Sequence, residues 1–138
     1  MDPYPKAYLY RRLVQAKLYI DARYVEPIDV DDISGEAAFS KFHFIRLFKS
    51  VYGLAPHAYL TRVRIDRAQD LLKKGLAVAE ACHAVGFTSA ASFSLLFKRA
   101  TGITPSQYRA RCLRRAEQQR IRPLSAVPNC FAQAKGWS

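Results

Sequence analysis

The side chains that could do covalent or metal chemistry are few in this sequence, and they are scattered. Three cysteines, Cys82, Cys112 and Cys130, and three histidines form neither CxxC nor CxxH spacing. Structural zinc sites and disulfide frameworks depend on such spacing. No Cys–His pair and no glycine-rich phosphate loop accompanies them. We therefore expect no catalytic residue, no metal and no cofactor, and we interpret the cysteines as packing residues.

Recognition of a polyanion is the chemistry that the charge distribution favours. The chain has 22 basic and 11 acidic side chains, a net charge of +11. Residues 1–40 hold five basic and seven acidic side chains, net −2, whereas residues 41–122 hold sixteen and four, net +12. A strongly basic segment indicates nucleic acid first and a membrane surface second.

Nothing in the sequence indicates a membrane protein. No apolar run approaches the roughly 20 residues that span a bilayer, and the first residues lack the basic-then-apolar layout of a signal peptide. We expect a cytoplasmic protein associated with the nucleoid.

The chain contains an internal repeat, which becomes visible when the sequence is shifted by 49 residues. Nine positions then carry identical or similar residues. The first members of these pairs are Phe44, Leu47, Phe48, Lys49, Gly53, Leu54, Pro56, Tyr59 and Arg62, and the second members are Phe93, Leu96, Phe97, Lys98, Gly102, Ile103, Pro105, Tyr108 and Arg111. The chain is therefore predicted to contain the same supersecondary unit twice. Two copies indicate two equivalent contacts with a partner that is itself periodic.

Each copy is predicted to be a short helix, a tight turn and an amphipathic helix. Ser40 and Ser89 are suited to cap the amphipathic helices, and Gly53 and Gly102 to end them. Apolar residues at spacing i, i+3, i+4, i+7 predict the buried faces. These are Phe44, Leu47, Phe48 and Val51 in the first copy, and Phe93, Leu96, Phe97 and Ala100 in the second. This pattern is a helix-turn-helix, whose second helix enters the major groove of DNA.

Three further helices complete the prediction of an all-α fold, because no segment alternates with period two. They cover about residues 8–24, 56–74 and 104–113, and the last could be extended by Arg114, Arg115, Arg120 and Arg122. From about His57 to Lys73 the middle helix would be about 26 Å long at 1.5 Å per residue. Adjacent major-groove faces lie roughly 34–36 Å apart, so one monomer could contact two groove segments without dimerising.

Helical geometry predicts which side chains of the first copy face DNA. If Phe44 and Phe48 point inward, the outward set is Lys41, Phe42, Ile45, Arg46 and Lys49. Arg46 is the best candidate for base readout, because a guanidinium pairs bidentately with guanine, for about 1–3 kcal/mol of discrimination. Phe42 and Ile45 could contact thymine methyl groups, and Lys41 and Lys49 phosphates.

The second copy is predicted to read bases less. The repeat places four base-readout candidates, Ala90, Ala91, Ser94 and Leu95, together with Lys98, at the corresponding positions. Of these, only Ser94 and Lys98 can hydrogen-bond, and the small residues would admit close approach and contact with thymine methyl groups. We expect the first unit to read bases directly. The second would mainly bind phosphates, through Thr88, Ser89, Lys98 and the helix N-terminus at Thr104. Ser40 has the matching phosphate role in the first unit.

These stretches resemble the DNA-binding domain of the AraC-type transcription regulators. The resemblance rests on SKFHFIRLFK at 40–49 and GLAP at 53–56, and more diagnostically on VGFTS at 85–89, FSLLFK at 93–98 and GITPSQYR at 102–109. It covers about residues 8–112. It implies seven helices with two helix-turn-helix units joined by a linker helix, and base contacts at Phe42, Ile45 and Arg46.

The resemblance also implies an organisation and a function. Residues 8–55 would form the first unit, 56–75 the linker helix and 76–112 the second unit, followed by a basic, proline-containing tail at 113–138. The function implied is sequence-specific binding of double-stranded DNA by a stand-alone regulator, as a rule an activator that also contacts RNA polymerase.

Three alternatives stay open at this stage. A non-specific architectural DNA-binding protein would share the charge and would explain the weaker second unit. A DNA-repair enzyme with a reactive cysteine, or a redox sensor, would need a thiol of depressed pKa.

Overall fold

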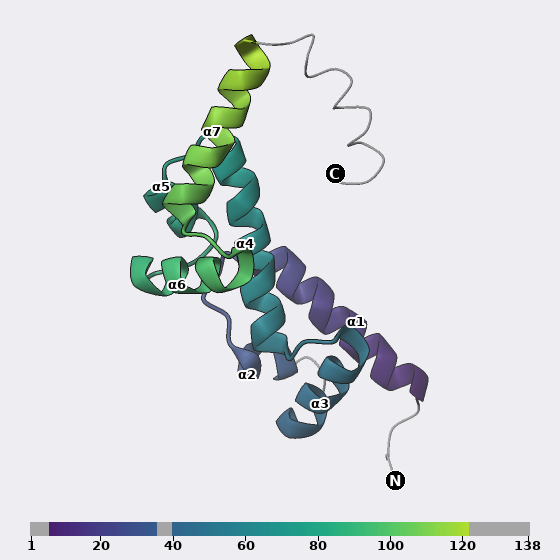
Figure 1. The fold of residues 1–138 in the computed structure, drawn as a ribbon. Coiled ribbons are helices and arrows are strands. Elements are labelled where there is room, and N and C mark those ends of the chain that lie inside the picture. Colours follow the sequence, from purple (N-terminus) through teal and green to yellow (C-terminus); the bar gives the residue numbers. More distant parts are fainter. Residues whose placement is uncertain (1–5, 36–39, 122–138) are drawn as a thin grey trace.

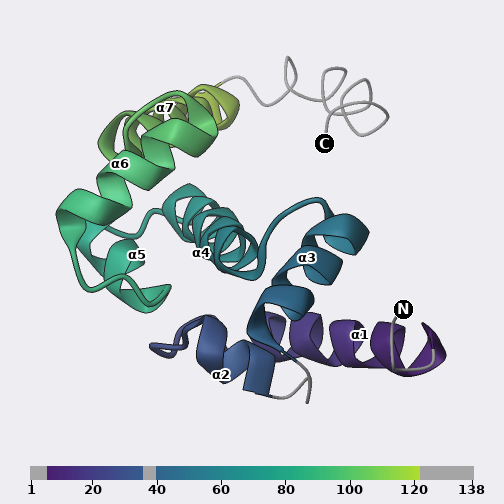
Figure 2. The same ribbon diagram turned by 90° about the horizontal axis from the view of Figure 1, so that it is seen from below.

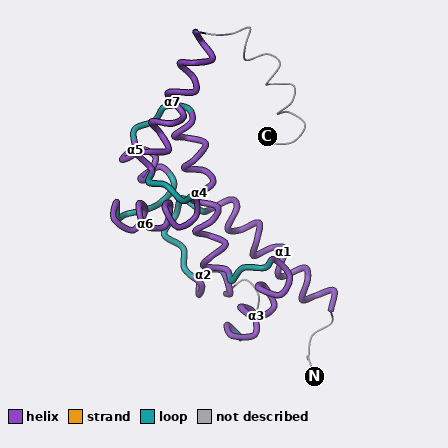
Figure 3. Tube along the Cα trace, in the orientation of Figure 1, coloured by secondary structure: helices purple, strands orange, loops and turns teal. Residues whose placement is uncertain are grey.

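The computed structural model describes residues 6–35 and 40–121. Within these ranges all regular secondary structure is helical, and there is no strand. In order the helices are α1 (Lys6–Arg23), α2 (Val30–Gly35), α3 (Lys41–Tyr52), α4 (Pro56–Lys73), α5 (Val78–Ala84), α6 (Ala90–Thr101) and α7 (Pro105–Ile121). Short loops form the described connections between them (Figure 3). The prediction of an all-α fold with seven helices and two helix-turn-helix units, α2–α3 and α5–α6, is confirmed.

The two amphipathic helices, α3 and α6, begin and end in the same way. Each has twelve residues. The Oγ atoms of Ser40 and Ser89 each accept a hydrogen bond from a backbone N–H three residues on, at 3.2 Å. Gly53 and Gly102 end the helices in the left-handed conformation, with φ of 81° and 87°. The sequence repeat is therefore also a repeat of helix boundaries.

Each unit has its own hydrophobic core, and α4 contributes to both. The first core comprises Leu13, Ala16, Ile20, Ile33, Phe44, Phe48 and Leu60. The second comprises Ile65, Ala68, Leu72, Ala81, Cys82, Val85, Phe87, Phe93 and Phe97. Helices α1–α3 gather around one part of α4 and α5–α7 around the other (Figures 1 and 2). Because α4 is one continuous helix, a single element contributes side chains to both cores.

The aromatic packing of the two cores is also repeated. The ring of Phe48 meets that of Tyr59 at 5.7 Å between centroids, and the ring of Phe97 meets that of Tyr108 at 5.4 Å, both at 72°. Each pair joins an amphipathic helix to the helix that follows it. Edge-on pairs of this kind add about 0.5–1.5 kcal/mol beyond the area they bury.

Two apolar positions predicted to be inward are exposed instead. Val51 and Ala100 lie in the last turns of α3 and α6 and face solvent. In the first unit Tyr52 covers the core there, with its ring 4.7 Å from that of Phe48. In the second unit Thr101 takes the equivalent place, and its hydroxyl donates to the carbonyl of Phe97 at 2.8 Å.

The last helix is longer than the predicted end near residue 113. It continues to Ile121 and extends beyond the other helices (Figure 1). Arg114, Arg115 and Arg120 therefore belong to it, as the extended alternative allowed. Arg122, Cys130 and the rest of the predicted tail lie outside the described residues, as do residues 36–39.

Gly86, in the turn between α5 and α6, lies against the loop that connects α1 to α2. Its φ is +95°, and a Cβ atom placed there would be 2.7 Å from the backbone oxygen of Val25 and 2.9 Å from that of Tyr24. Neither backbone atom can move aside as a flexible side chain could. Glycine is therefore required at this position for two reasons, the positive φ and the close approach of another chain segment.

Gly86→Ala is expected to destabilise the protein more than Gly53→Ala. Gly53 has a similar positive φ but open space around its Cα, so alanine there costs only the left-handed conformation, about 1–2 kcal/mol. At position 86 the steric overlap adds about 1–3 kcal/mol. Chemical denaturation followed by circular dichroism measures both free energies of unfolding. Equal losses for the two variants would contradict the close approach at Gly86.

Candidate nucleic-acid interface

The outer face of α3 presents the side chains expected to contact DNA. Phe42 is 73% exposed, which is unusual for a phenylalanine. Lys41, Arg46 and Lys49 are also exposed. Ile45 differs from the prediction, since it is half-buried and packs against the first core. The inward arc of the helix runs through Phe44, Phe48 and Tyr52, and Ile45 lies at its border.

The outer face of α6 has the same position in its unit but a different chemistry. Ala90 and Ala91 are exposed, and Leu95 is 55% exposed at the position that Arg46 has in the first unit. Ser94 is half-buried, like Ile45. Lys98 is exposed in the last turn, next to Arg99, an exposed charge that the sequence analysis missed because the repeat places Ser50 there. The face is therefore apolar along most of its length and basic at one end.

The residues predicted to bind phosphates through helix N-termini are helix caps or their neighbours. The Ser40 and Ser89 hydroxyls accept from α3 and α6, and Thr88 is exposed beside Ser89. At α7 the Thr104 hydroxyl accepts from the backbone N–H of Gln107 at 3.2 Å, while the Thr104 N–H donates to the Gln107 side chain at 3.0 Å. A hydroxyl that accepts in this way keeps its own hydrogen to donate.

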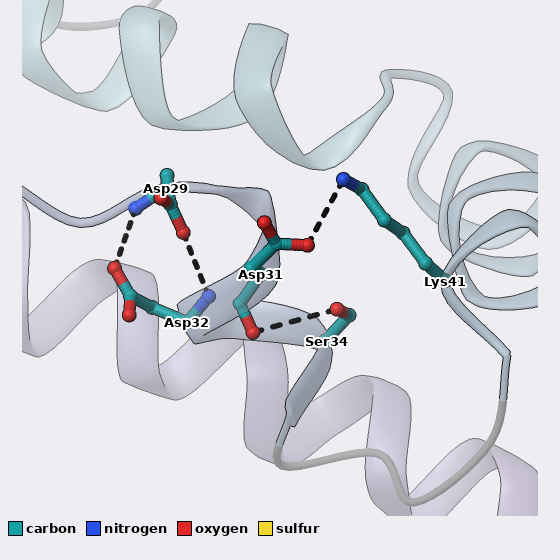
Figure 4. Close-up of polar contacts among 5 residues, drawn as sticks. All are labelled: Asp29, Asp31, Asp32, Ser34 and Lys41. Atoms are coloured by element: carbon teal, nitrogen blue, oxygen red, sulfur yellow. Dashed lines mark hydrogen bonds and ion pairs between the residues drawn. The ribbon is translucent and has the colours of Figure 1, made fainter.

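Lys41 has an intramolecular partner that the sequence analysis did not find. Its Nζ lies 2.9 Å from a carboxylate oxygen of Asp31, on α2 (Figure 4). Lys41 is the first residue of α3, where the positive end of the helix dipole disfavours a cation, and α3 has no acidic residue in its first turn. Asp31 supplies the compensating negative charge from the neighbouring helix. A DNA phosphate that binds Lys41 must therefore compete with Asp31.

Asp29 and Asp32 hold the start of α2, where Asp31 lies. Each carboxylate accepts a hydrogen bond from the backbone N–H of the other residue, both at 2.8 Å (Figure 4). The bond from the Asp32 N–H lowers the pKa of Asp29 below its usual value. This reciprocal cap fixes the first turn of α2 and with it the backbone of Asp31. The acidic segment thus positions the carboxylate that faces Lys41.

Cys82 does not have the surroundings of a reactive thiol, and the described residues hold no cluster suited to a metal ion. Cys82 is buried in the second core, and burial raises the pKa of its thiol, which is the reverse of what a reactive thiol requires. Along residues 6–35 and 40–121, no three His, Cys, Asp or Glu side chains lie together as a metal site would need. Every helix in these ranges also falls short of the length and apolarity of a membrane span.

Comparisons with known proteins agree with this arrangement. A family model described as "Helix-turn-helix domain" matches residues 33–111. The crystal structure of the DNA-binding domain of AdpA, a global transcriptional factor, in complex with a target DNA has a TM-score of 0.73 and 30% identity, over 78% of this chain and 97% of that one. An AraC-type regulator structure from Chromobacterium violaceum has a TM-score of 0.67 and 30% identity, over 78% and 96%.

Among curated relatives, AdaA of Bacillus subtilis, a bifunctional transcriptional activator and DNA repair enzyme, is 30% identical over 92 residues, which are 66% of this chain and 44% of AdaA. The match covers only 27–37% of the length of several other curated regulators. The similarity is thus to one domain of longer proteins.

Asp31→Asn is expected to tighten binding to DNA duplexes about 1.5- to 5-fold. The substitution frees Lys41 from an exposed ion pair of about 0.2–1 kcal/mol, and 1.4 kcal/mol corresponds to a tenfold change. Titration of a labelled duplex at low salt measures the affinity. In a Lys41→Met background the same substitution should give a smaller gain. An equal gain in both backgrounds would show that Asp31 acts on DNA without Lys41.

Proposed function

The chain belongs to the helix-turn-helix family of AraC-type transcription regulators, and from this we propose that it binds double-stranded DNA sequence-specifically and regulates transcription. Residues 8–112 would make up the DNA-binding domain, with α3 and α6 as recognition helices in adjacent major grooves. The observation that carries the proposal is the presence of two equally long, equally capped helices with exposed outer faces, held by one helix, α4. The related AdpA domain was crystallised on its target DNA.

We propose that the first unit provides most of the base readout. On α3 the exposed Arg46 can pair with a guanine, and the exposed Phe42 can contact a thymine methyl group. On α6 the exposed Ala90, Ala91 and Leu95 offer apolar contact only. Lys49, Lys98 and the capped helix N-termini at Ser40, Ser89 and Thr104 would bind phosphates and set the register.

The remaining parts of the proposal rest on the family. A chain with two recognition helices can occupy two groove segments as a monomer, so dimerisation is not needed for DNA binding. Activation through contact with RNA polymerase, in the cytoplasm and on the nucleoid, is proposed by analogy with the family alone. The repair activity that AdaA's name records is not part of the proposal, because burial raises the pKa of the Cys82 thiol, the reverse of what a nucleophilic cysteine requires.

A non-specific architectural role is the alternative that the sequence left open. Selection of bound sequences from a random duplex pool, at about 50 and 200 mM salt, separates the two functions. A motif across about two helical turns, strong on one side and loose or T-rich on the other, supports the asymmetric regulator. The absence of a motif, with binding that is lost at the higher salt, supports the architectural role.

Arg46→Ala is expected to lower the affinity for the selected site about 5- to 150-fold and to relax the preference at one base pair. A bidentate guanine contact contributes about 1–3 kcal/mol of discrimination. Lys49→Ala is the matched control in the same helix, since loss of a phosphate contact weakens binding to all sequences alike and reduces the salt slope by about one. Repeating the selection with Leu95→Ala should leave the strong half of the motif intact. If Leu95→Ala abolished the motif and Arg46→Ala preserved it, the second unit would be the principal reader.

A further inference from the structure

Arg64 lies on α4 at the point where the helix passes from one core to the other. Leu60 belongs to the first core and Val63 packs against it, whereas Ile65 and Ala68 belong to the second. Arg64 is half-buried between them. Any group at this point is close to both helix-turn-helix units.

The Arg64 guanidinium holds the loop between α1 and α2. Its Nε donates to the backbone oxygen of Tyr24 at 2.7 Å, and an Nη atom donates to that of Glu26 at 2.8 Å. The planar fork of donors makes such a double contact directional. The same guanidinium lies 5.8 Å from the centroid of the Phe87 ring, which belongs to the second unit. Arg64 thus contacts both units at once.

The loop that Arg64 holds also lies directly against the second unit. The backbone oxygens of Tyr24 and Val25 approach Gly86 so closely that no Cβ atom fits there. The Tyr24 side chain packs against both cores, and the Arg67 guanidinium lies 6.0 Å from its ring. We call residues 24–26 together with Arg64, Gly86 and Phe87 the inter-unit contact.

We propose that the inter-unit contact fixes the angle and distance between α3 and α6, and so restricts the protein to one spacing between the two halves of its DNA site. The α4 backbone connects the units, but each unit packs on it through side chains that can shift. The inter-unit contact adds a second connection, in which the loop that Arg64 holds lies directly against Gly86. With two connections, rotation of one unit relative to the other must break hydrogen bonds or push backbone into backbone.

The proposal rests on the proposed function, since it assumes that both helices bind one DNA duplex. One inserted base pair moves the second half-site by about 3.4 Å along the axis and rotates it by about 34–36°. A rigid pair of recognition helices cannot follow that change. A loosely connected pair can follow it in part.

Arg109 provides a matched control. Its Nε donates to the backbone oxygen of Leu76 at 2.8 Å, and its Nη2 to that of Gly75 at 3.1 Å. It therefore holds a loop by the same double contact as Arg64 does. Both oxygens lie in the loop between α4 and α5, on the second unit's side of the molecule. Arg109→Met should cost stability as Arg64→Met does, but it should leave the relation between the units unchanged.

The experiment measures affinities for the selected site and for versions with one base pair inserted or removed between its halves. The affinity of the wild-type protein is expected to fall about tenfold or more when a base pair is either inserted or removed. Arg64→Met, which keeps the aliphatic stem, is expected to bind the selected site more weakly than the wild type does. Its affinity should fall less than about threefold when the spacing is changed. Arg109→Met should keep the wild-type ratio. A wild-type protein that tolerates both spacings overturns the proposal, as does an Arg64→Met protein with the wild-type ratio.

A measurement without DNA tests this inference separately from the proposed function. It also gives a result if the Arg64→Met variant binds DNA poorly. Spin labels at Ser50 and Arg99, exposed and equivalent positions of α3 and α6, report the distance between the helices in a background without Cys82, Cys112 and Cys130. One narrow distance distribution is expected, and Arg64→Met should broaden it while Arg109→Met should not. Equal widths in all three proteins overturn the inference even if DNA binding is sequence-specific. Narrow wild-type and broad Arg64→Met distributions uphold the role of the inter-unit contact in fixing α3 relative to α6, even if no motif is selected and the proposed function fails.

Discussion

The use of one helix by two hydrophobic cores is the constraint on which the rest of the structure depends. A unit of about 40 residues buries too little apolar surface to be stable alone. Here Leu60 completes the first core, and Ile65, Ala68 and Leu72 contribute to the second. Because both units need α4, neither can move far from it without exposing its own core. Stability of each unit and geometry of the pair are therefore coupled.

Corresponding residues of the two units match in the cores but differ on the outer faces. Positions that build the helices match closely, as in the pairs Phe48–Phe97 and Tyr59–Tyr108, which even share their interplanar angle. Positions on the outer faces do not match, since Leu95 stands where the first unit has Arg46. Packing tolerates little change in volume, whereas an exposed position is restricted only by what it binds. This difference fits two equally shaped units that contact DNA in different ways.

Local signals in the sequence predicted the elements well, and contacts between distant residues could not be predicted. Phe44 and Phe48, with their counterparts Phe93 and Phe97, follow from periodicity alone, and Gly53 and Gly102 mark the helix ends because left-handed backbone favours glycine. The exposure of Val51 depends on Tyr52 meeting Phe48 and Tyr59, which no spacing rule contains. The full length of α7 could have been predicted from the sequence, because residues 106–121 contain no glycine or proline.

Ion pairs and hydrogen bonds between helices also change what the net charge means. The count of +12 over residues 41–122 treats every basic side chain as available to a polyanion. Lys41 is paired with Asp31, Arg120 with Glu117, and Arg64 and Arg109 donate to backbone oxygens. Counterion release counts only charges that meet phosphates, so affinity depends on exposed residues such as Lys49 and Lys98 more than on the total. Part of the basic character of this chain thus holds its loops and helices in place, and only the remainder is available to DNA.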